Sequence, residues 1–233
     1  MASLPAPGQT MRDSWRRLSP LPGGKWLFSQ RSWTPIPFMV LLACLSFHES
    51  RDSVSWIPGL ICLLLGEGLR LWGVAMVGKE SRTRGSGVGR LATSGPYRYV
   101  RNPLYLGNFF LTLGATFISE LLWFIPVVVG FFVVQYVPIV FWEENILAER
   151  FGAAYADYCR RVPRWIPRWQ TQKLEVAPVF RADYQWRGAF RSERSTFGTL
   201  AALLLVMLVK ENIRHVPKYL HKHASGISIG MRS

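Results

Sequence analysis

The sequence lacks the features that mark several common protein classes. It has only three cysteines, Cys44, Cys62 and Cys159, and no two of them have the spacing of a metal site. An odd number of cysteines also argues against a disulfide framework. We therefore expect Cys44 and Cys62 to be small buried residues and Cys159 to be an incidental thiol. The basic, Pro/Gly-rich N-terminus shows no short apolar core with a cleavage site, so we expect no secretory signal peptide.

Acidic residues are also scarce, with 14 Asp and Glu against 28 Lys and Arg. A net charge of +14 would suit a nucleic-acid-binding protein. Here, however, the basic residues flank apolar runs, and 49% of all residues are hydrophobic. Bunched apolar runs separated by basic loops are typical of a multi-span membrane protein. We expect membrane lipid around the chain and no nucleic-acid partner.

Five apolar segments are candidates for membrane helices. They cover residues 32–48, 54–78, 104–119, 121–142 and 197–209. A membrane-spanning helix needs about 20 apolar residues, so the second and fourth segments are long enough and the first and third are short. The fifth is of marginal length: we favour a crossing, and the alternatives are that it lies at the membrane interface or packs against protein. The sequence thus predicts an all-α, polytopic membrane bundle of about five transmembrane helices.

The third and fourth segments are separated only by Glu120, so they predict a tight helical hairpin. Pro138 lies inside the fourth segment, and we expect it to bend that helix shortly before Glu143. The hairpin would return the chain to the face from which it came.

The distribution of basic residues predicts the orientation in the membrane. Basic residues precede the first segment, fill the loop between the second and third, and follow the fourth, whereas the two short opposite loops carry almost no net charge. The positive-inside rule then places the Glu143 end on the cytoplasmic side. If residues 197–209 cross, the basic residues after them lie outside, where long side chains can reach the interface.

Two polar clusters, at residues 94–107 and 143–167, flank the predicted hairpin on its cytoplasmic side. Pro103 should open a helix, which leaves free N–H groups near Tyr105 that suit a ligand carboxylate. Glu143 would suit an ammonium group or a ribose hydroxyl. Together the clusters predict a pocket for a zwitterionic, aromatic ligand.

These clusters carry a known pattern: R-x-P-x-Y-x-G, six residues, G, then a long apolar run that ends in E-E. The residues that fill it are Arg101, Pro103, Tyr105, Gly107, Gly114, Glu143 and Glu144. The sequence thereby resembles the isoprenylcysteine carboxyl methyltransferase and phospholipid methyltransferase superfamily. The resemblance covers about residues 89–167, including the F-G-x-x-Y-x-x-Y-x-x-x-V-P motif near their end.

The resemblance implies a site for S-adenosylmethionine. The cofactor-binding positions that it implies are Gly89, Arg90, Leu91, Ala92, Tyr97, Asn102, Pro103, Leu104, Tyr105, Gly107, Glu143 and Glu144. Two residues depart from the isoprenylcysteine enzymes. Asn102 replaces the usual His and cannot titrate. Ile139 stands where those enzymes have an Arg for the substrate carboxylate, which leaves the methyl acceptor open.

A sulfonium donor is already activated, so the protein mainly has to align two reactants. No general base is obligatory, and Arg101 is the best candidate for orienting charge at the transfer. The acceptor is a lipid-like or small molecule with a carboxylate, amine or thiol. Glu67 and Arg70 lie on one face of the second segment. They form either an internal ion pair that allows both to be buried or part of the acceptor pocket.

Other interpretations remain. The glycine-rich stretch at residues 85–89 has no preceding strand and no Gly-Lys-Ser/Thr ending, so it is not a nucleotide-binding fingerprint. A membrane sterol-type reductase using nicotinamide, or an inactive membrane scaffold, are the rival functions. We divide the chain into a basic N-terminal segment, an N-terminal transmembrane hairpin, a methyltransferase core and a C-terminal part with a linker, the fifth apolar segment and a basic tail. Their bounds are residues 1–31, 32–79, 80–167 and 168–233.

Overall fold

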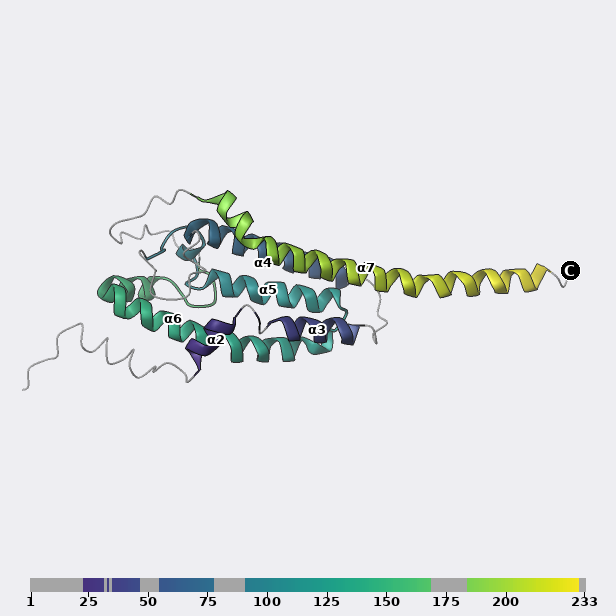
Figure 1. Cartoon of the computed structure of the whole chain (residues 1–233), viewed down its shortest axis with the longest axis horizontal. Coiled ribbons are helices and arrows are strands. Elements are labelled where there is room, and N and C mark those ends of the chain that lie inside the picture. The colour runs from purple at the N-terminus through teal and green to yellow at the C-terminus, as the bar shows by residue number, and fades with distance from the viewer. Residues whose placement is uncertain are drawn as a thin grey trace, which may run out of the picture.

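The computed structural model describes residues 23–31, 33, 35–46, 55–77, 91–168 and 184–230, with side chains up to residue 213. This part of the chain is all-helical, as the sequence predicts. Figure 1 shows the long helices side by side along the longest axis of the molecule. The elements are α2 (Gly24–Gln30), α3 (Pro35–Ser46), α4 (Trp56–Val77), η3 (Gly95–Arg98), α5 (Pro103–Ile118), η4 (Leu122–Phe124), α6 (Ile125–Arg161) and α7 (Trp186–Gly230).

All five predicted apolar segments contain a helix. Three helical stretches are long and apolar enough to cross a membrane, namely Trp56–Val77, Leu122–Arg161 and Trp186–Ile213. The stretches Pro37–Ser46 and Pro103–Ile118 are apolar but shorter. The chain is therefore an integral membrane protein with a bundle of five apolar helices, three of which have spanning length.

The central core lies where α5 passes into α6, and every one of the five apolar helices contributes to it. Its buried side chains are Phe38, Leu42, Leu63, Ala115, Ile118, Leu121, Phe124, Val128, Leu203 and Met207. The outer surface of the bundle is apolar as well, since Leu64 of α4 is 74% exposed. Cys44 is exposed on α3 and Cys62 is partly exposed, so the prediction that both are buried was wrong. In a membrane protein a small apolar side chain can face lipid instead of the core.

Paired glycines bring α4 and α5 into close contact. A Cβ atom at Gly107 would lie 2.8 Å from the carbonyl oxygen of Gly66, and one at Gly114 would lie 2.8 Å from that of Gly59. Small residues at such crossings let two helix backbones approach. α4 therefore fills the space along Gly107 and Gly114.

The hairpin predicted at Glu120 is confirmed. α5 ends at Ile118, Glu120 adopts a positive φ of 63° and η4 begins at Leu122. Residues around Pro138 keep helical backbone angles, and the break in α6 lies instead at Gly152, with φ 51° and ψ −121°. Because Gly152 lacks a Cβ atom, it can adopt this positive φ without strain.

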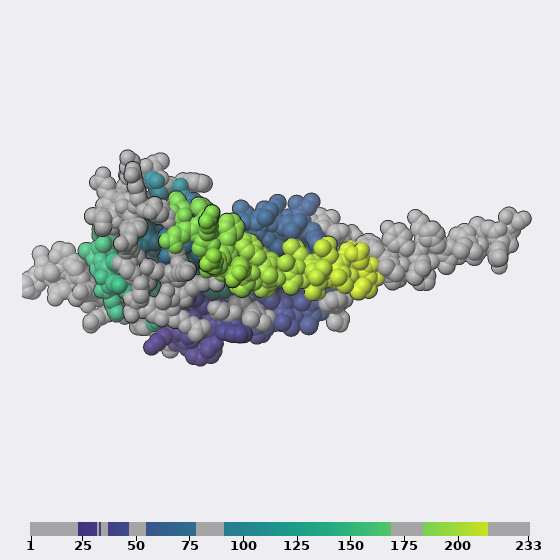
Figure 2. All heavy atoms as spheres, turned by 45° about the horizontal axis from the view of Figure 1, so that its top comes forward, coloured from purple at the N-terminus to yellow at the C-terminus, as the bar shows by residue number. Residues whose placement is uncertain are grey.

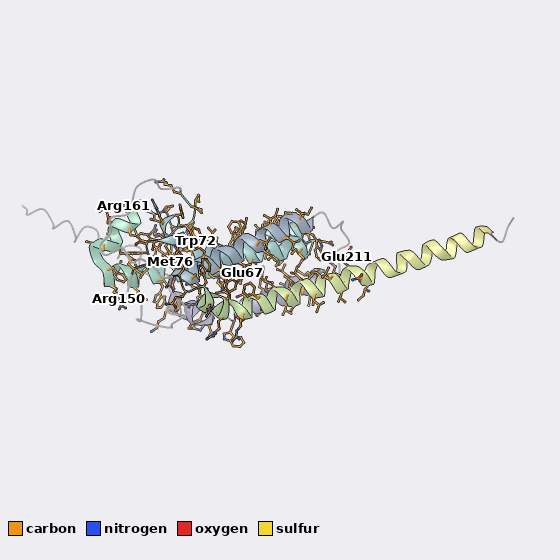
Figure 3. The ribbon with its side chains drawn as sticks, turned by 90° about the horizontal axis from the view of Figure 1, so that it is seen from above. Glu67, Trp72, Met76, Arg150, Arg161 and Glu211 are labelled. Atoms are coloured by element: carbon orange, nitrogen blue, oxygen red, sulfur yellow. The ribbon has the colours of Figure 1, made fainter. Side chains whose placement is uncertain are left out.

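The last helix is much longer than its apolar segment at residues 197–209. It begins at Trp186 and continues to Gly230, beyond the end of the bundle in Figure 1. Figure 2 shows α7 lying across one face of the molecule, with α4 along one of its edges. The molecule has two distinct ends: Figure 3 places Arg150 and Arg161 at one of them, with Glu211 toward the other.

Candidate functional site

The structure brings the two predicted polar clusters together at the Arg150 end of the bundle. The backbone N–H of Arg101 donates to the carbonyl of Pro163 at 2.9 Å, and that of Arg168 donates to the carbonyl of Tyr99 at 3.0 Å. The Tyr158 hydroxyl donates to the Tyr97 carbonyl at 2.7 Å. The loop before α5 is thus fastened to the end of α6 and the segment after it.

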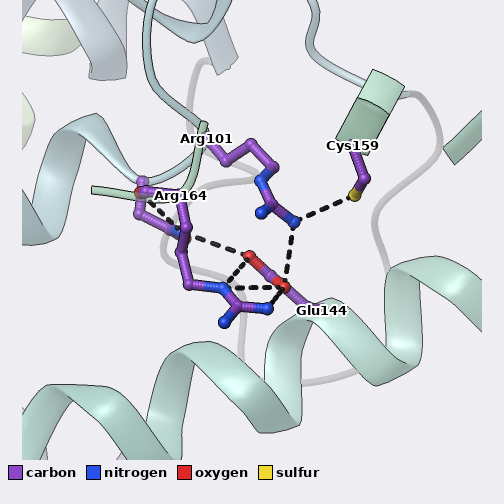
Figure 4. A network of polar contacts seen from close by, with 5 residues as sticks. Arg101, Glu144, Cys159 and Arg164 are labelled. Atoms are coloured by element: carbon purple, nitrogen blue, oxygen red, sulfur yellow. Dashed lines mark hydrogen bonds and ion pairs between the residues drawn. The ribbon is translucent and has the colours of Figure 1, made fainter. Parts of the chain in front are cut away.

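Glu144 lies at the centre of this junction and is 2% exposed. Its carboxylate accepts from Arg164 Nη2 at 2.7 Å and from Arg101 Nη1 at 3.1 Å, and Asn102 Nδ2 donates to it at 3.4 Å. Figure 4 shows both guanidinium groups converging on the carboxylate. One buried negative charge therefore holds two arginines from segments on either side of it in the sequence.

Cys159 belongs to the same cluster. Its Sγ accepts a hydrogen bond from Arg101 Nη1 at 3.0 Å, as Figure 4 also shows. Interpreting this thiol as incidental was therefore wrong. The contact escaped prediction because sequence alone does not place Cys159 beside Arg101.

Glu143 has different partners, although it is the next residue in the chain. The Tyr105 hydroxyl hydrogen-bonds to its carboxylate, and Arg31 Nη1 lies 3.9 Å from Glu143 Oε1. Arg31 in turn lies over the ring of Phe28, 3.7 Å from the centroid. The short helix α2 thus packs on α6 and faces Glu143 with a cation.

Tyr97 of η3 completes this side of the junction. Burial raises the pKa of the Tyr97 hydroxyl, and the negative charge of Glu143 raises it further. Tyr97 is therefore a neutral hydrogen-bonding group near Glu143 at ordinary pH. Asn102 precedes Pro103, the first residue of α5, so the start of this helix lies at the junction, as predicted.

Other predicted cofactor positions lie elsewhere. Leu91 packs against the cluster formed by Tyr155, Tyr158 and Val162, and Ala92 is half-buried next to it. Leu104 and Gly107 face α4: a Cβ atom at Gly107 would lie 2.6 Å from Arg70 Cγ, and Leu104 packs against the cluster of Val74, Ala75 and Ala189. Gly89 and Arg90 lie outside the described residues.

Glu67 and Arg70 do form an ion pair inside the bundle, with Arg70 Nε 3.8 Å from Glu67 Oε2. Arg70 also binds Asn108 of α5 and Glu193 of α7, with Nη2 2.5 Å from Oε2. Sequence reasoning missed Asn108, Arg164 and Glu193. Arg164 looked like one more positive-inside charge, and Glu193 lies in a polar stretch outside the motif.

A cavity of about 190 Å³ lies on the α4 side of the loop before α5. Its lining residues are Leu69, Trp72, Pro96, Tyr99, Val100, Pro167 and Arg168. Within the part of the chain that the structure describes, no three His, Cys, Asp or Glu residues gather as a metal site would require.

Comparisons with known proteins point to one family. The family model of phospholipid methyltransferases matches residues 54–154. Protein-S-isoprenylcysteine O-methyltransferase B of Arabidopsis thaliana is 31% identical over 143 residues, which cover 57% of this chain and 70% of that protein.

Two bacterial relatives are named for metal resistance rather than for methyl transfer. The cobalt-zinc-cadmium resistance protein CzcN of Cupriavidus metallidurans is 34% identical over 55% of this chain and 59% of its own length. The nickel-cobalt-cadmium resistance protein NccN of Alcaligenes xylosoxydans is 27% identical over 58% of this chain and 63% of its own. The chain thus spans about three fifths of the length of these two relatives. No solved structure matches it significantly.

Proposed function

We propose that this chain, which belongs to the isoprenylcysteine carboxyl methyltransferase and phospholipid methyltransferase superfamily, transfers a methyl group from S-adenosylmethionine to a lipid-like or small acceptor. The observation that carries the proposal is the convergence of Tyr97, Tyr105 and Glu143 beside the start of α5. These residues come from three separate elements, and the methyltransferase resemblance assigns all of them to the cofactor.

The residues at this junction fit the chemistry of the methyl donor. The first turn of α5 offers backbone N–H groups and the positive end of a helix dipole to a carboxylate. Glu143 offers a carboxylate to an ammonium group or a ribose hydroxyl. The neutral Tyr97 and Tyr105 hydroxyls add hydrogen-bonding groups at the same place.

The donor supplies an activated methyl group on a sulfonium, so the protein needs no nucleophile of its own. Its residues have to hold donor and acceptor in line and exclude water, which is worth roughly 7–11 kcal/mol of the barrier. Arg101 Nη1 donates to both Glu144 and Cys159. Its proposed contribution is therefore to position the loop before α5 rather than to contact the reacting atoms.

The acceptor is not an isoprenylcysteine whose carboxylate is bound by an Arg at position 139. Ile139, which stands at the position of the substrate-binding Arg, is fully buried and packs in a cluster with Phe28, Tyr105 and Tyr136. No cation occupies that position, so an acceptor carboxylate would need another partner. A lipid-like acceptor reaching the site from the bilayer fits a junction at the end of apolar helices. The positive-inside rule supports placing this junction on the cytoplasmic side.

A direct test is to measure binding of S-adenosylmethionine to the purified full chain, and then to incubate it with labelled donor and a lipid extract. We expect binding of the donor, no binding of nicotinamide nucleotides, and label in a lipid-like or small product. Glu143→Ala and Tyr105→Ala should abolish both binding and labelling.

The rival functions predict other results. A sterol-type reductase would bind the nicotinamide nucleotide, and a scaffold would bind neither. An inactive scaffold would also keep its function in Glu143→Ala and lose it in Gly114→Leu, which disrupts the contact between α4 and α5. Failure of the wild-type chain to bind the methyl donor would overturn the proposal.

A further inference from the structure

A second buried polar network lies between the apolar helices, and Arg70 of α4 is its centre. Its guanidinium donates to Asn108 of α5 and to Glu193 of α7, while Glu67 of α4 lies beside it. Thr196 Oγ1 donates to Glu193 Oε2 at 2.8 Å, and the Glu193 side chain has no exposed surface. Figure 3 shows Glu67 within the body of the bundle. Ionisable groups in such surroundings are costly and are usually functional.

The network continues toward the proposed cofactor site. Asn108 Nδ2 donates to the Tyr136 hydroxyl at 3.3 Å. The Tyr136 ring lies 5.3 Å from that of Tyr105, whose hydroxyl binds Glu143. Because the Asn108 oxygen accepts from Arg70, its amide nitrogen must face Tyr136. The contact with Arg70 therefore sets the orientation of the Asn108 amide. That amide in turn contacts Tyr136, which packs against Tyr105 beside Glu143.

Glu193 lies outside residues 54–154, the part matched by the family. α7 is also held by a second buried ion pair, in which Lys210 Nζ lies 3.7 Å from Glu120 Oε2. The two pairs are about 25 Å apart along α7, at 1.5 Å per residue. Both attach α7 to the bundle, and among the contacts described above the pair at Glu193 is the one that leads to Glu143.

We propose that Glu193 is a positioning residue for the methyl-transfer site, acting through Arg70, Asn108 and Tyr136 on Tyr105. The inference rests on the proposed function and deepens it, because it makes α7 part of the enzyme rather than an added membrane anchor. Without the Glu193 carboxylate, Arg70 keeps Glu67 as its anionic partner among the described residues and turns toward it. Asn108 then loses the contact that sets its amide, and Tyr136 and Tyr105 lose their fixed position beside Glu143.

The test compares two ways of weakening the attachment of α7 to the bundle in the full chain. The affinity for S-adenosylmethionine and the thermal unfolding temperature are measured for each variant. Glu193→Gln removes the charge at the connected pair. Lys210→Met combined with Glu120→Gln removes the unconnected pair and is the matched control. We expect Glu193→Gln to weaken donor binding by roughly tenfold, within the 5–150-fold range usual for coupled sites. The control should unfold at a lower temperature with unchanged donor affinity.

A second variant keeps the test decisive if Glu193→Gln does not fold. Arg70→Met combined with Glu67→Gln and Glu193→Met removes all three charges of the network, so no buried carboxylate loses its counter-ion. A protein core often tolerates the replacement of a complete buried ion-pair network. This variant should fold and show the same loss of donor affinity, and Glu193→Asp should restore part of the affinity lost in Glu193→Gln.

Three outcomes would count against the inference, and they can be told apart. Unchanged donor affinity in the folded variant that carries Arg70→Met, Glu67→Gln and Glu193→Met would overturn the positioning role alone. An equal loss of affinity in the control would do the same, because it would show a general effect of loosening α7. A wild-type chain that binds no donor would overturn the proposed function and this inference with it.

Discussion

Glu143 and Glu144 are consecutive carboxylates with separate surroundings. Glu144 is enclosed by Arg101, Arg164 and Asn102, so its hydrogen-bonding capacity is largely used within the protein. Glu143 faces Tyr105 and a more distant Arg31, which leaves capacity for a ligand. The first carboxylate of the pair is therefore the one suited to binding, and the second holds the site together.

Replacing Glu144 should mainly reduce stability. In Glu144→Ala two partly buried guanidinium groups lose their counter-ion, and removing one partner of a buried ion pair costs up to about 3–5 kcal/mol. We expect a clear fall in the thermal unfolding temperature in detergent, with loss of donor binding as a secondary effect. Unfolding at the wild-type temperature would contradict the central role of Glu144.

Replacing Glu143 should mainly reduce binding. A hydrogen bond to a charged group contributes about 1.5–3 kcal/mol, so Glu143→Gln should weaken S-adenosylmethionine affinity by roughly ten- to a hundredfold. Its unfolding temperature should stay near the wild-type value, because Arg31 lies 3.9 Å away and loses little. Isothermal titration on both Glu variants, with unfolding measured in parallel, tests this division of roles.

The sequence could identify these residues but not their division of roles. The motif assigned Tyr97, Tyr105, Glu143 and Glu144 to one cofactor site, because it records residues that a family shares. It could not show that Arg164 closes over Glu144, since a contact between segments distant in sequence has no local signal. The same holds for Glu193, which no motif includes.

At the scale of elements, the contact between α4 and α5 decides how the bundle packs. A Cβ atom at Gly107 would lie within 3 Å of Gly66 and Arg70, whereas one at Gly68, on the opposite side of α4, would have nothing within 4 Å. The two helices therefore tolerate no side chain at their crossing, while glycines elsewhere on them are not under that restriction.

Gly107→Ala should destabilise the protein by about 1–3 kcal/mol, the usual cost of overpacking. Gly68→Ala is the matched control. Since Ala is favoured over Gly in a helix by about 1 kcal/mol, it should be neutral or stabilising. Thermal unfolding of the two variants in the same detergent checks the prediction, and equal stability in both would show that the helices separate without cost.

Element boundaries were predictable where apolar character marks them. The first three segments and the turn at Glu120 agree with α3 to α5 and with the start of α6 because hydrophobic runs and their interruptions follow membrane helices. The end of α6 at Arg161 lies well beyond the fourth segment. α7 was recognised only through its apolar centre, since polar helical turns give no hydropathy signal. The break in α6 was expected at Pro138, but Pro138 continues the helix beside α2, and Gly152 provides the positive φ.

At the scale of the whole molecule, α7 determines on which side the chain ends. The stretch Trp186–Ile213 is long enough to cross a membrane, and it runs from the Glu143 end toward the opposite end of the bundle (Figure 1). The Glu143 end and the C-terminus should therefore lie on opposite sides of the membrane.

Reporter fusions can test this orientation. A reporter active only in the cytoplasm should be active when fused after Arg168, where α7 is missing, and inactive when fused to the C-terminus of the full chain. The two fusions differ only by the C-terminal part, so each serves as the control of the other. Equal reporter activity in both would mean that α7 does not cross.

The contact of Glu144 with residues on both sides of it in the sequence sets an order for biogenesis. Arg101 and Asn102 leave the ribosome first, Glu144 follows after the α5–α6 hairpin, and Arg164 comes last. Until Arg164 has emerged, the Glu144 carboxylate of a nascent chain has one of its two arginine partners. The loop before α5 also lacks its contacts with the segment after α6. Under the proposed function, donor binding requires all three segments. We therefore expect a chain terminated between Glu144 and Arg164 to contain the hairpin and to bind no methyl donor.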